Sequence, residues 1–155
     1  MKKILYLHGL ESQQGGEKVD FLSSRGSVYA PKMDYEDPKL FNTLNKIMVE
    51  FNPDLIIGSS MGGYTADILG GLFTKPTILF NPALHSRTIQ PNYYGIKVKR
   101  ILPSIVVLGS EDPIIDPTIT KRMLEDYDTI IDIEGMGHRI PLEIFVDTYN
   151  KYVEQ

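Results

Sequence analysis

Residues 54–66, DLIIGSSMGGYTA, place a serine where it could act as a nucleophile. The apolar run Leu55–Ile57 leads into the G-x-S-x-G pattern Gly58–Gly62, and a helix-compatible stretch follows. When this pattern joins a strand to a helix, the sharp turn exposes the central serine hydroxyl above the carboxyl end of the strand. Ser60 is therefore predicted to be a catalytic nucleophile. The alternative is that the glycines only allow tight strand–helix packing or cradle a phosphate.

A general base is expected after the serine and after an acid, because hydrolases with this motif order their catalytic residues as Ser, Asp or Glu, then His. The chain has three histidines, and His138 is the one that fits this order near a strand end. It follows the β-like run Thr129–Ile133 and a Gly-rich loop. We predict that His138 accepts the proton of Ser60.

The acid should lie between these two residues, just past a strand. The most strand-like run is Ser104–Leu108, and the sequence GSED follows it directly. Asp112 is the preferred candidate, Asp116 the second and Glu111 a weaker third. An aspartate before a proline also suits a turn or a helix N-cap, so Asp112 could instead have that structural role.

Donors for an oxyanion are expected at two places. The first is the backbone N–H of Met61, directly after the nucleophile, at the N-terminus of a helix, where negative charge is favoured. The second is the N–H of Leu10 or a neighbour, because His8-Gly9-Leu10 follows the buried strand-like run Lys3–Leu7. We expect His8 to hold this loop beside the substrate by hydrogen bonding, rather than to transfer a proton.

Alternating strand-like and helix-like segments indicate an α/β fold. The expected strands are Lys3–Leu7, Ser27–Ala30, Asp54–Ile57, Thr77–Phe80, Ser104–Leu108 and Thr129–Ile133, and the expected helices are Glu17–Ser24, Pro38–Phe51, Met61–Leu72, Pro117–Tyr127 and Pro141–Val153. This alternation predicts a mostly parallel sheet of six strands with helices on both faces.

The stretch Asn81–Arg100 fits neither pattern. It leaves the strand next to the one that carries Ser60, so we expect a reduced cap over the serine. Tyr93 and Tyr94 are candidate substrate contacts, and the alternative is that they pack this loop onto the body of the domain.

Five segments in order, LYLHGLESQ, GSSMGGYTA, FNPAL, GSEDPIID and EGMGHRI, resemble the YqiA-like small esterases of the α/β-hydrolase superfamily. The resemblance covers nearly the whole chain. It implies a minimal α/β-hydrolase that cleaves carboxylic esters or acyl thioesters, with Ser60 as nucleophile, Asp112 as acid and His138 as base. The chain departs from the family pattern in a shorter segment after Ala83 and in Arg139, which stands where a small residue is usual.

Composition agrees with a small enzyme domain. The chain has 155 residues, a formal net charge of −4 and no cysteine, which excludes disulfides, a thiolate nucleophile and a zinc–thiolate site. The densest basic patch, Lys97, Lys99 and Arg100, is expected to be solvated or to meet an anionic leaving group. We therefore expect one domain over 1–155, no metal or cofactor, and no nucleic-acid partner.

The start of the chain, MKKILYLHG, has an apolar run too short for a signal peptide or a membrane span. A cytoplasmic location is the resulting expectation.

The sequence thus predicts a serine hydrolase that acts on a small ester or thioester through an acyl-enzyme. A peptidase or acyltransferase using the same residues is an alternative, as is a binding protein that keeps the fold without catalysis. A nucleotide-binding domain is disfavoured, because the chain has neither G-x-x-x-x-G-K-[ST] nor G-x-G-x-x-G after its first strand.

Overall fold

The computed structural model describes residues 1–10 and 12–154, which form one six-stranded sheet. The strands are β1 (Lys3–Leu7), β2 (Ser27–Tyr29), β3 (Leu55–Ser59), β4 (Thr77–Phe80), β5 (Ser104–Gly109) and β6 (Thr129–Ile133). Their order across the sheet is β2-β1-β3-β4-β5-β6, and all neighbouring pairs are parallel. The expected α/β fold is confirmed, with a sheet that is parallel throughout the described residues.

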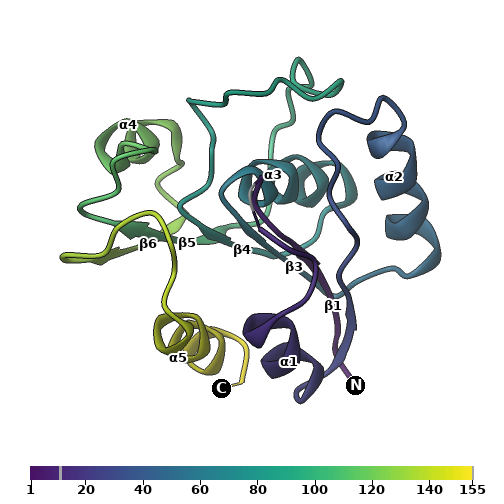
Figure 1. The fold of residues 1–155 in the computed structure, drawn as a ribbon, viewed down its shortest axis with the longest axis horizontal. Coiled ribbons are helices and arrows are strands. Elements are labelled where there is room, and N and C mark those ends of the chain that lie inside the picture. The colour runs from purple at the N-terminus through teal and green to yellow at the C-terminus, as the bar shows by residue number, and fades with distance from the viewer. Residues whose placement is uncertain (11, 155) are drawn as a thin grey trace.

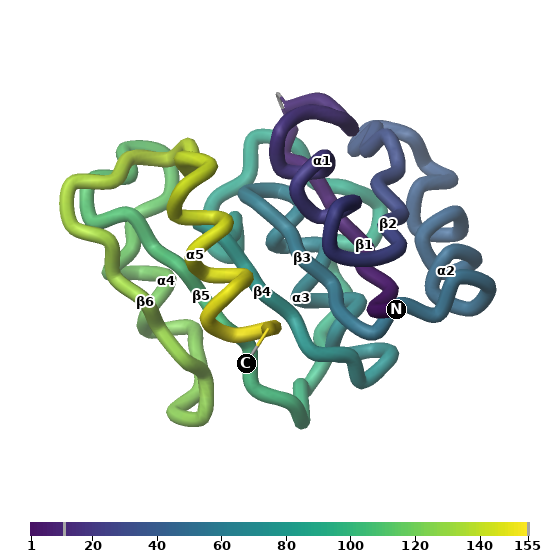
Figure 2. Tube along the Cα trace, turned by 90° about the horizontal axis from the view of Figure 1, so that it is seen from below, coloured from purple at the N-terminus to yellow at the C-terminus, as the bar shows by residue number. Residues whose placement is uncertain are grey.

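Helices cover both faces of this sheet (Figure 1). Helices α1 (Glu17–Ser23) and α5 (Leu142–Tyr152) lie on one face, which Figure 2 shows from its outer side. Helices α2 (Leu40–Glu50), α3 (Met61–Phe73) and α4 (Pro117–Met123) lie on the other. This two-sided cover explains why the central strands read as continuous apolar runs instead of alternating polar and apolar residues.

Side chains of β1 illustrate how the two cores form. Leu5 and Leu7 belong to the core under α2 and α3, whereas Ile4 and Tyr6 belong to the core under α1 and α5. Successive residues of a strand point to opposite faces, so one five-residue strand supplies both cores. All four side chains are nearly inaccessible to solvent.

The strand order fixes where a site can form. The chain leaves β1 outward to β2 and then crosses back to β3, so the connections that follow β1 and β3 diverge. Such a switch in strand order opens a crevice at the carboxyl ends of the strands, where open α/β sheets bind ligands. Here the loop that begins at His8 lies on one side of the crevice and the turn at Ser60 on the other.

Two helices begin or end more than one residue away from the sequence expectation, while the ends of the other three agree with it to within one residue. Helix α2 begins at Leu40 instead of Pro38, because the preceding residues form a turn in which the Asp37 side chain accepts the Lys39 N–H. Helix α4 ends at Met123 instead of Tyr127, since Asp128 accepts the Glu125 N–H and folds the following residues into a turn. A tertiary contact of Asp128, described below, holds this turn in place.

Candidate active site

Ser60 occupies the turn between β3 and α3 in a backbone conformation that is unusual for a residue with a side chain. Its φ is 56° and its ψ is −116°. Such a conformation costs about 1–3 kcal/mol and persists only where the surroundings enforce it. Here the Ser60 N–H donates to the carbonyl of Phe80 at 3.0 Å, and its carbonyl accepts the N–H of Ala83 at 2.9 Å. Strand β4 and the loop after it therefore hold the turn from both sides.

The glycines of the G-x-S-x-G pattern are required by close backbone contacts. A Cβ atom on Gly58 would collide with the carbonyl of Gly62, and one on Gly62 would collide with the carbonyl of Leu7. Helix α3 thus begins almost in contact with β1 and β3. This is the packing function that the glycines were expected to have, and it coincides with the exposed serine turn.

A continuous chain of hydrogen bonds joins the three residues predicted as nucleophile, base and acid. His138 Nε2 lies 2.9 Å from Ser60 Oγ, and His138 Nδ1 lies 2.7 Å from Asp112 Oδ2. A carboxylate only accepts hydrogen bonds, so the neutral ring carries its proton on Nδ1 and leaves Nε2 free to accept from the serine. This is the tautomer that a general base for Ser60 needs.

Asp112 makes the contacts of both arrangements considered from the sequence, one with its own turn and one with His138. Its Oδ1 accepts the N–H groups of Ile114 at 2.8 Å and Ile115 at 3.0 Å, which forms the turn, while Oδ2 faces His138. The side chain has no solvent exposure. The other two acids point elsewhere: Asp116 Oδ1 caps α4 by accepting the Thr118 N–H, and Glu111 is exposed.

Asn81 is a residue of the site that the sequence reasoning did not single out. Its side-chain NH₂ donates to the carbonyls of Gly137 at 3.1 Å and His138 at 2.9 Å, and its Oδ1 accepts the Gly109 N–H at 2.8 Å. It is buried and has a positive φ of 40°. Asn81 therefore ties the end of β5 to the loop that carries His138. The sequence feature that could have indicated Asn81 is its position in an Asn-Pro pair directly after the strand Thr77–Phe80.

The loop after β1 is held by hydrogen bonds of the His8 ring, as expected. His8 Nδ1 donates to the carbonyl of Gly9 at 2.7 Å, and Nε2 accepts the Met33 N–H at 2.9 Å. Both ring nitrogens therefore bind backbone, and a substrate contact at His8 stays a prediction. Gly9 packs against Ser60 as a result, with its ideal Cβ position 3.2 Å from Ser60 Cβ.

A cavity of about 330 Å³ opens in front of Ser60. Both residues expected to supply oxyanion donors, Leu10 and Met61, line it together with Ser60 and His138. The remaining lining residues are Gly9, Ser12, Ala83, Ser86, Arg87, Thr88, Ile114, Ile115 and Arg139. The volume is at the lower end of the range for small-molecule sites.

Neither tyrosine predicted as a substrate contact lines this cavity. Tyr93 is buried against α3, where its hydroxyl lies 2.8 Å from Thr65 Oγ1 and its ring stacks on Tyr64. Burial raises the pKa of Tyr93 to about 12. Tyr94 is exposed, and its carbonyl accepts the hydroxyl of Tyr64. Both tyrosines fasten the loop to α3, which was the alternative considered.

The segment 81–100 therefore has two parts. Residues Ala83, Ser86, Arg87 and Thr88 line the cavity, as expected of a reduced cap, whereas Tyr93 and the residues around Val98 pack on α3. Tertiary packing, and not a local sequence pattern, decides which residues of the segment line the cavity and which pack on α3.

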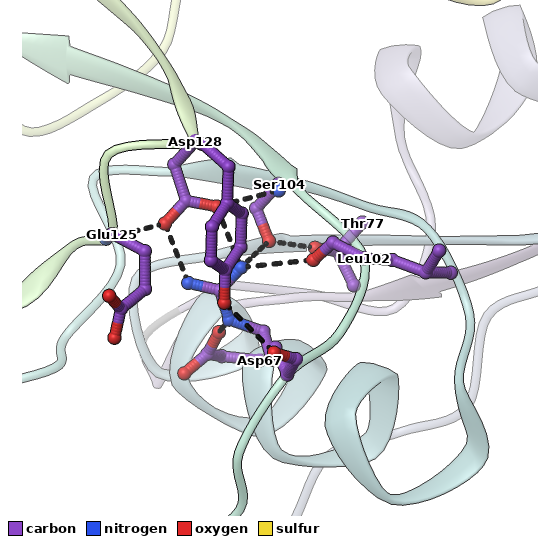
Figure 3. A network of polar contacts seen from close by, with 8 residues as sticks. Asp67, Thr77, Leu102, Ser104, Glu125 and Asp128 are labelled. Carbon is purple, nitrogen blue, oxygen red and sulfur yellow. Dashed lines mark hydrogen bonds and ion pairs between the residues drawn. The ribbon is translucent and has the colours of Figure 1, made fainter.

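The end of this segment is fixed by Arg100, which was expected to be a solvated or substrate-facing cation. Instead, its Nε lies 2.8 Å from Asp67 Oδ1 on α3, and its Nη1 and Nη2 each lie 2.7 Å from a carboxylate oxygen of Asp128. Figure 3 shows this network, with Ser104 and Thr77 beside it. It joins α3, the 81–100 segment and the turn before β6.

Burial and pairing with Arg100 have opposite effects on the pKa values of Asp67 and Asp128. Burial raises the pKa of Asp67, and Arg100 lowers it in part. Burial also favours the protonated form of Asp128, but hydrogen bonds from Arg100 and from the N–H groups of Ser104 and Glu125 outweigh it and lower the pKa of that carboxyl. The ionised pair of Arg100 and Asp128 is thus the stable form at neutral pH.

No group of three or more His, Asp or Glu side chains that could hold a metal ion is found in residues 1–10 and 12–154. Within the same residues, no helix is long and apolar enough to cross a membrane.

A comparison with protein families assigns residues 3–101 to the uncharacterised protein family UPF0227. The chain belongs to the UPF0227 family. A UPF0227 protein of Vibrio atlanticus is 28% identical over 163 residues, which cover 88% of this chain and 90% of that protein. The UPF0227 protein YcfP of Escherichia coli is 27% identical over 164 residues, covering 88% and 89%.

Solved structures share the fold of this UPF0227 protein at low sequence identity. A monoacylglycerol lipase of Paleococcus ferrophilus has a TM-score of 0.75 and 17% identity, with 98% of this chain and 92% of that chain covered. A putative α/β-superfamily hydrolase of Xanthomonas campestris has a TM-score of 0.70 and 17% identity, with 97% and 99% covered. The fold is thus that of α/β-hydrolases, as the resemblance to the YqiA-like esterases implied.

Proposed function

We propose that this UPF0227 protein is a serine hydrolase that cleaves carboxylic esters or acyl thioesters of small molecules. The observation that carries the proposal is the unbroken chain from Ser60 Oγ through the His138 ring to Asp112, with contacts of 2.9 and 2.7 Å. A hydrogen bond between a serine and a histidine is by itself no sign of catalysis, because such bonds also stabilise structure. Here the serine also lies on a strained strand–helix turn beside a cavity, which is the arrangement of an activated nucleophile.

In the proposed mechanism, His138 Nε2 removes the hydroxyl proton of Ser60 as Oγ attacks the substrate carbonyl carbon. Asp112 keeps the ring proton on Nδ1 and stabilises the imidazolium that forms. The protonated His138 then gives its proton to the leaving alcohol or thiol, which departs and leaves an acyl-serine. Water repeats the same sequence, releases the acid and restores Ser60.

Negative charge on the carbonyl oxygen is assigned to the backbone N–H groups of Met61 and Leu10. The Met61 N–H is at the first position of α3, where backbone N–H groups have no partner within the helix. One such donor is typically worth about 3–4 kcal/mol in the transition state. Leu10 lines the same cavity from the side of β1, so the two donors would approach the oxyanion from different elements.

The proposal is tested by covalent labelling with a fluorophosphonate together with hydrolysis of p-nitrophenyl esters of graded chain length. We expect the wild type to be labelled and to prefer short acyl chains, since the cavity is only about 330 Å³. Ser60→Ala should abolish labelling and lower kcat by about 10⁴- to 10⁶-fold. Ser59→Ala is the matched control and should be labelled as the wild type is.

Retention of more than a tenth of the esterase activity in Ser60→Ala would contradict the proposal. Absence of both labelling and ester hydrolysis in the folded wild type would favour a binding protein with a hydrolase fold.

A further inference from the structure

The cavity in front of Ser60 has a charge that its catalytic residues do not account for. Its described lining contains two arginines, Arg87 and Arg139, and no aspartate or glutamate. The chain as a whole has more acidic than basic residues, 20 against 16, so a cavity with two cations and no described acid differs from the average surface. Low-dielectric walls around such a cavity strengthen its attraction for anions.

The neighbouring cavity shows that this charge is local. A second cavity of about 580 Å³ adjoins the first and shares Leu10 and Ser12 with it. Its described lining holds one cation, Lys32, and two acids, Asp34 and Glu36. Among the residues that the structure describes, the excess of positive charge therefore lies in the cavity lined by Arg87 and Arg139 and not in the neighbouring cavity.

Arg87 is held in a fixed position at the cavity. Its Nη1 donates to the carbonyls of Ala83 at 2.9 Å and Leu84 at 2.8 Å, and its guanidinium lies 4.0 Å from the centre of the Tyr64 ring. Among the described residues, no hydrogen-bond partner is found for its Nη2. A guanidinium that is already immobilised loses little conformational entropy when it binds a carboxylate or phosphate.

Arg139 follows His138 directly in the chain and also lines the cavity. Its side chain is exposed. An exposed arginine is by itself most simply a solvated side chain, but here it faces the cavity together with Arg87.

We infer that the substrate of this site carries an anionic group, a carboxylate or a phosphate, next to the scissile ester or thioester. This inference rests on the proposed hydrolase function and names its substrate class. The apolar residues of the same cavity, Leu10, Ala83, Ile114 and Ile115, suit a short hydrocarbon segment between the reacting carbonyl and the charge. Arg87 and Arg139 are specificity-determining residues in this assignment.

The test compares pairs of substrates in which one member carries a carboxylate and the other an uncharged group at the same position. In the acyl arm, p-nitrophenyl hydrogen adipate is compared with p-nitrophenyl hexanoate; in the alcohol arm, 4-acetoxybenzoate is compared with its methyl ester. We expect kcat/KM for the charged member to exceed that of its neutral partner by about tenfold or more in one arm, which identifies the part of the substrate that carries the anion. Added salt should lower this ratio.

Variants then assign the effect to the arginines. Arg139→Gln should lower the charged-to-neutral ratio of kcat/KM about tenfold. Arg87→Lys should retain more of the ratio than Arg87→Gln, because it keeps the charge. Arg122→Gln, an exposed arginine of α4 outside the cavity lining, is the control and should leave the ratio unchanged.

Two outcomes overturn the inference while leaving the proposed function intact. One is Ser60-dependent hydrolysis in which the neutral member is preferred in both arms. The other is a charged-to-neutral ratio that Arg139→Gln and Arg87→Gln leave unchanged. If no ester is cleaved in a Ser60-dependent manner and no fluorophosphonate labelling occurs, the hydrolase proposal itself fails and the inference fails with it.

Discussion

Replacing Asp112 by asparagine should separate its two functions. The aspartate uses Oδ1 to accept two backbone N–H groups, from Ile114 and Ile115, and Oδ2 to accept from His138 Nδ1. Asparagine has the same shape but only one acceptor oxygen. If that oxygen stays with the two N–H groups, the new NH₂ group faces His138 Nδ1 and can pair only with a ring that lacks a proton there.

The ring proton then moves to Nε2, which can no longer accept a proton from Ser60. Loss of the correct tautomer in serine–histidine–aspartate sites lowers kcat by about 10⁴-fold. At about 1.36 kcal/mol for each factor of ten, this corresponds to about 5 kcal/mol of transition-state stabilisation. The opposite amide orientation would set NH₂ against two N–H donors and leave them unsatisfied in a site with no solvent exposure, at a cost of about 1–3 kcal/mol each. The first orientation should therefore dominate.

The assay is kcat for hydrolysis of an unactivated alkyl ester, accompanied by thermal unfolding to show that Asp112→Asn is folded. Asp116→Asn is the matched control. Asp116 caps α4 through Thr118, and asparagine is an equally good N-cap, so its activity should change less than about twofold. Equal losses in the two variants, or more than a tenth of the activity left in Asp112→Asn, would refute the assigned role.

Two further predictions concern the residues that support the site. An aspartate in Asn81→Asp tolerates the positive φ but cannot donate to the carbonyls of Gly137 and His138. Both kcat and the rate of fluorophosphonate labelling should therefore fall about 10- to 100-fold. Unchanged labelling would mean that the loop carrying His138 needs no such support. Asp128→Asn should lower the free energy of unfolding by about 3 kcal/mol at pH 7, because it breaks a buried ion pair with Arg100. Since the pKa of Asp128 is lowered by folding, this contribution is complete above the unfolded carboxyl pKa of about 4 and is lost as pH falls through the folded value. Urea unfolding should therefore show a smaller difference at pH 3 than at pH 7, and the exposed Asp126→Asn should show little difference at either.

Much of this protein is determined by local sequence. The strands and helices follow from short apolar runs and their periodicity, and each expected element is present, with shifts of a few residues at some ends. The turn at Ser60 is equally local, because only glycine fits at Gly58 and Gly62 where backbones meet. The order of Ser60, an acid and His138 along the chain followed from the motif, and the structure brings the three residues together.

Tertiary structure alone decided which of the three acids faces His138. Asp112, Asp116 and Glu111 all follow β5 closely, and the direction of each side chain depends on turn geometry and on the loop after β6, 26 residues further along the chain. The same holds for Asn81, whose side chain reaches residues 56 and 57 positions away. No local pattern encodes contacts at such separations.

Local reasoning also misplaced the residues around the cavity. Tyr93 and Arg100, which looked available to a substrate, are buried in contacts with α3, whereas Arg87 and Arg139 line the cavity. An irregular segment has no periodicity that assigns its side chains to one face, so their burial is decided by which surfaces they meet when the sheet and helices assemble. Sequence therefore determined the elements and the reactive serine turn, while packing determined what surrounds it.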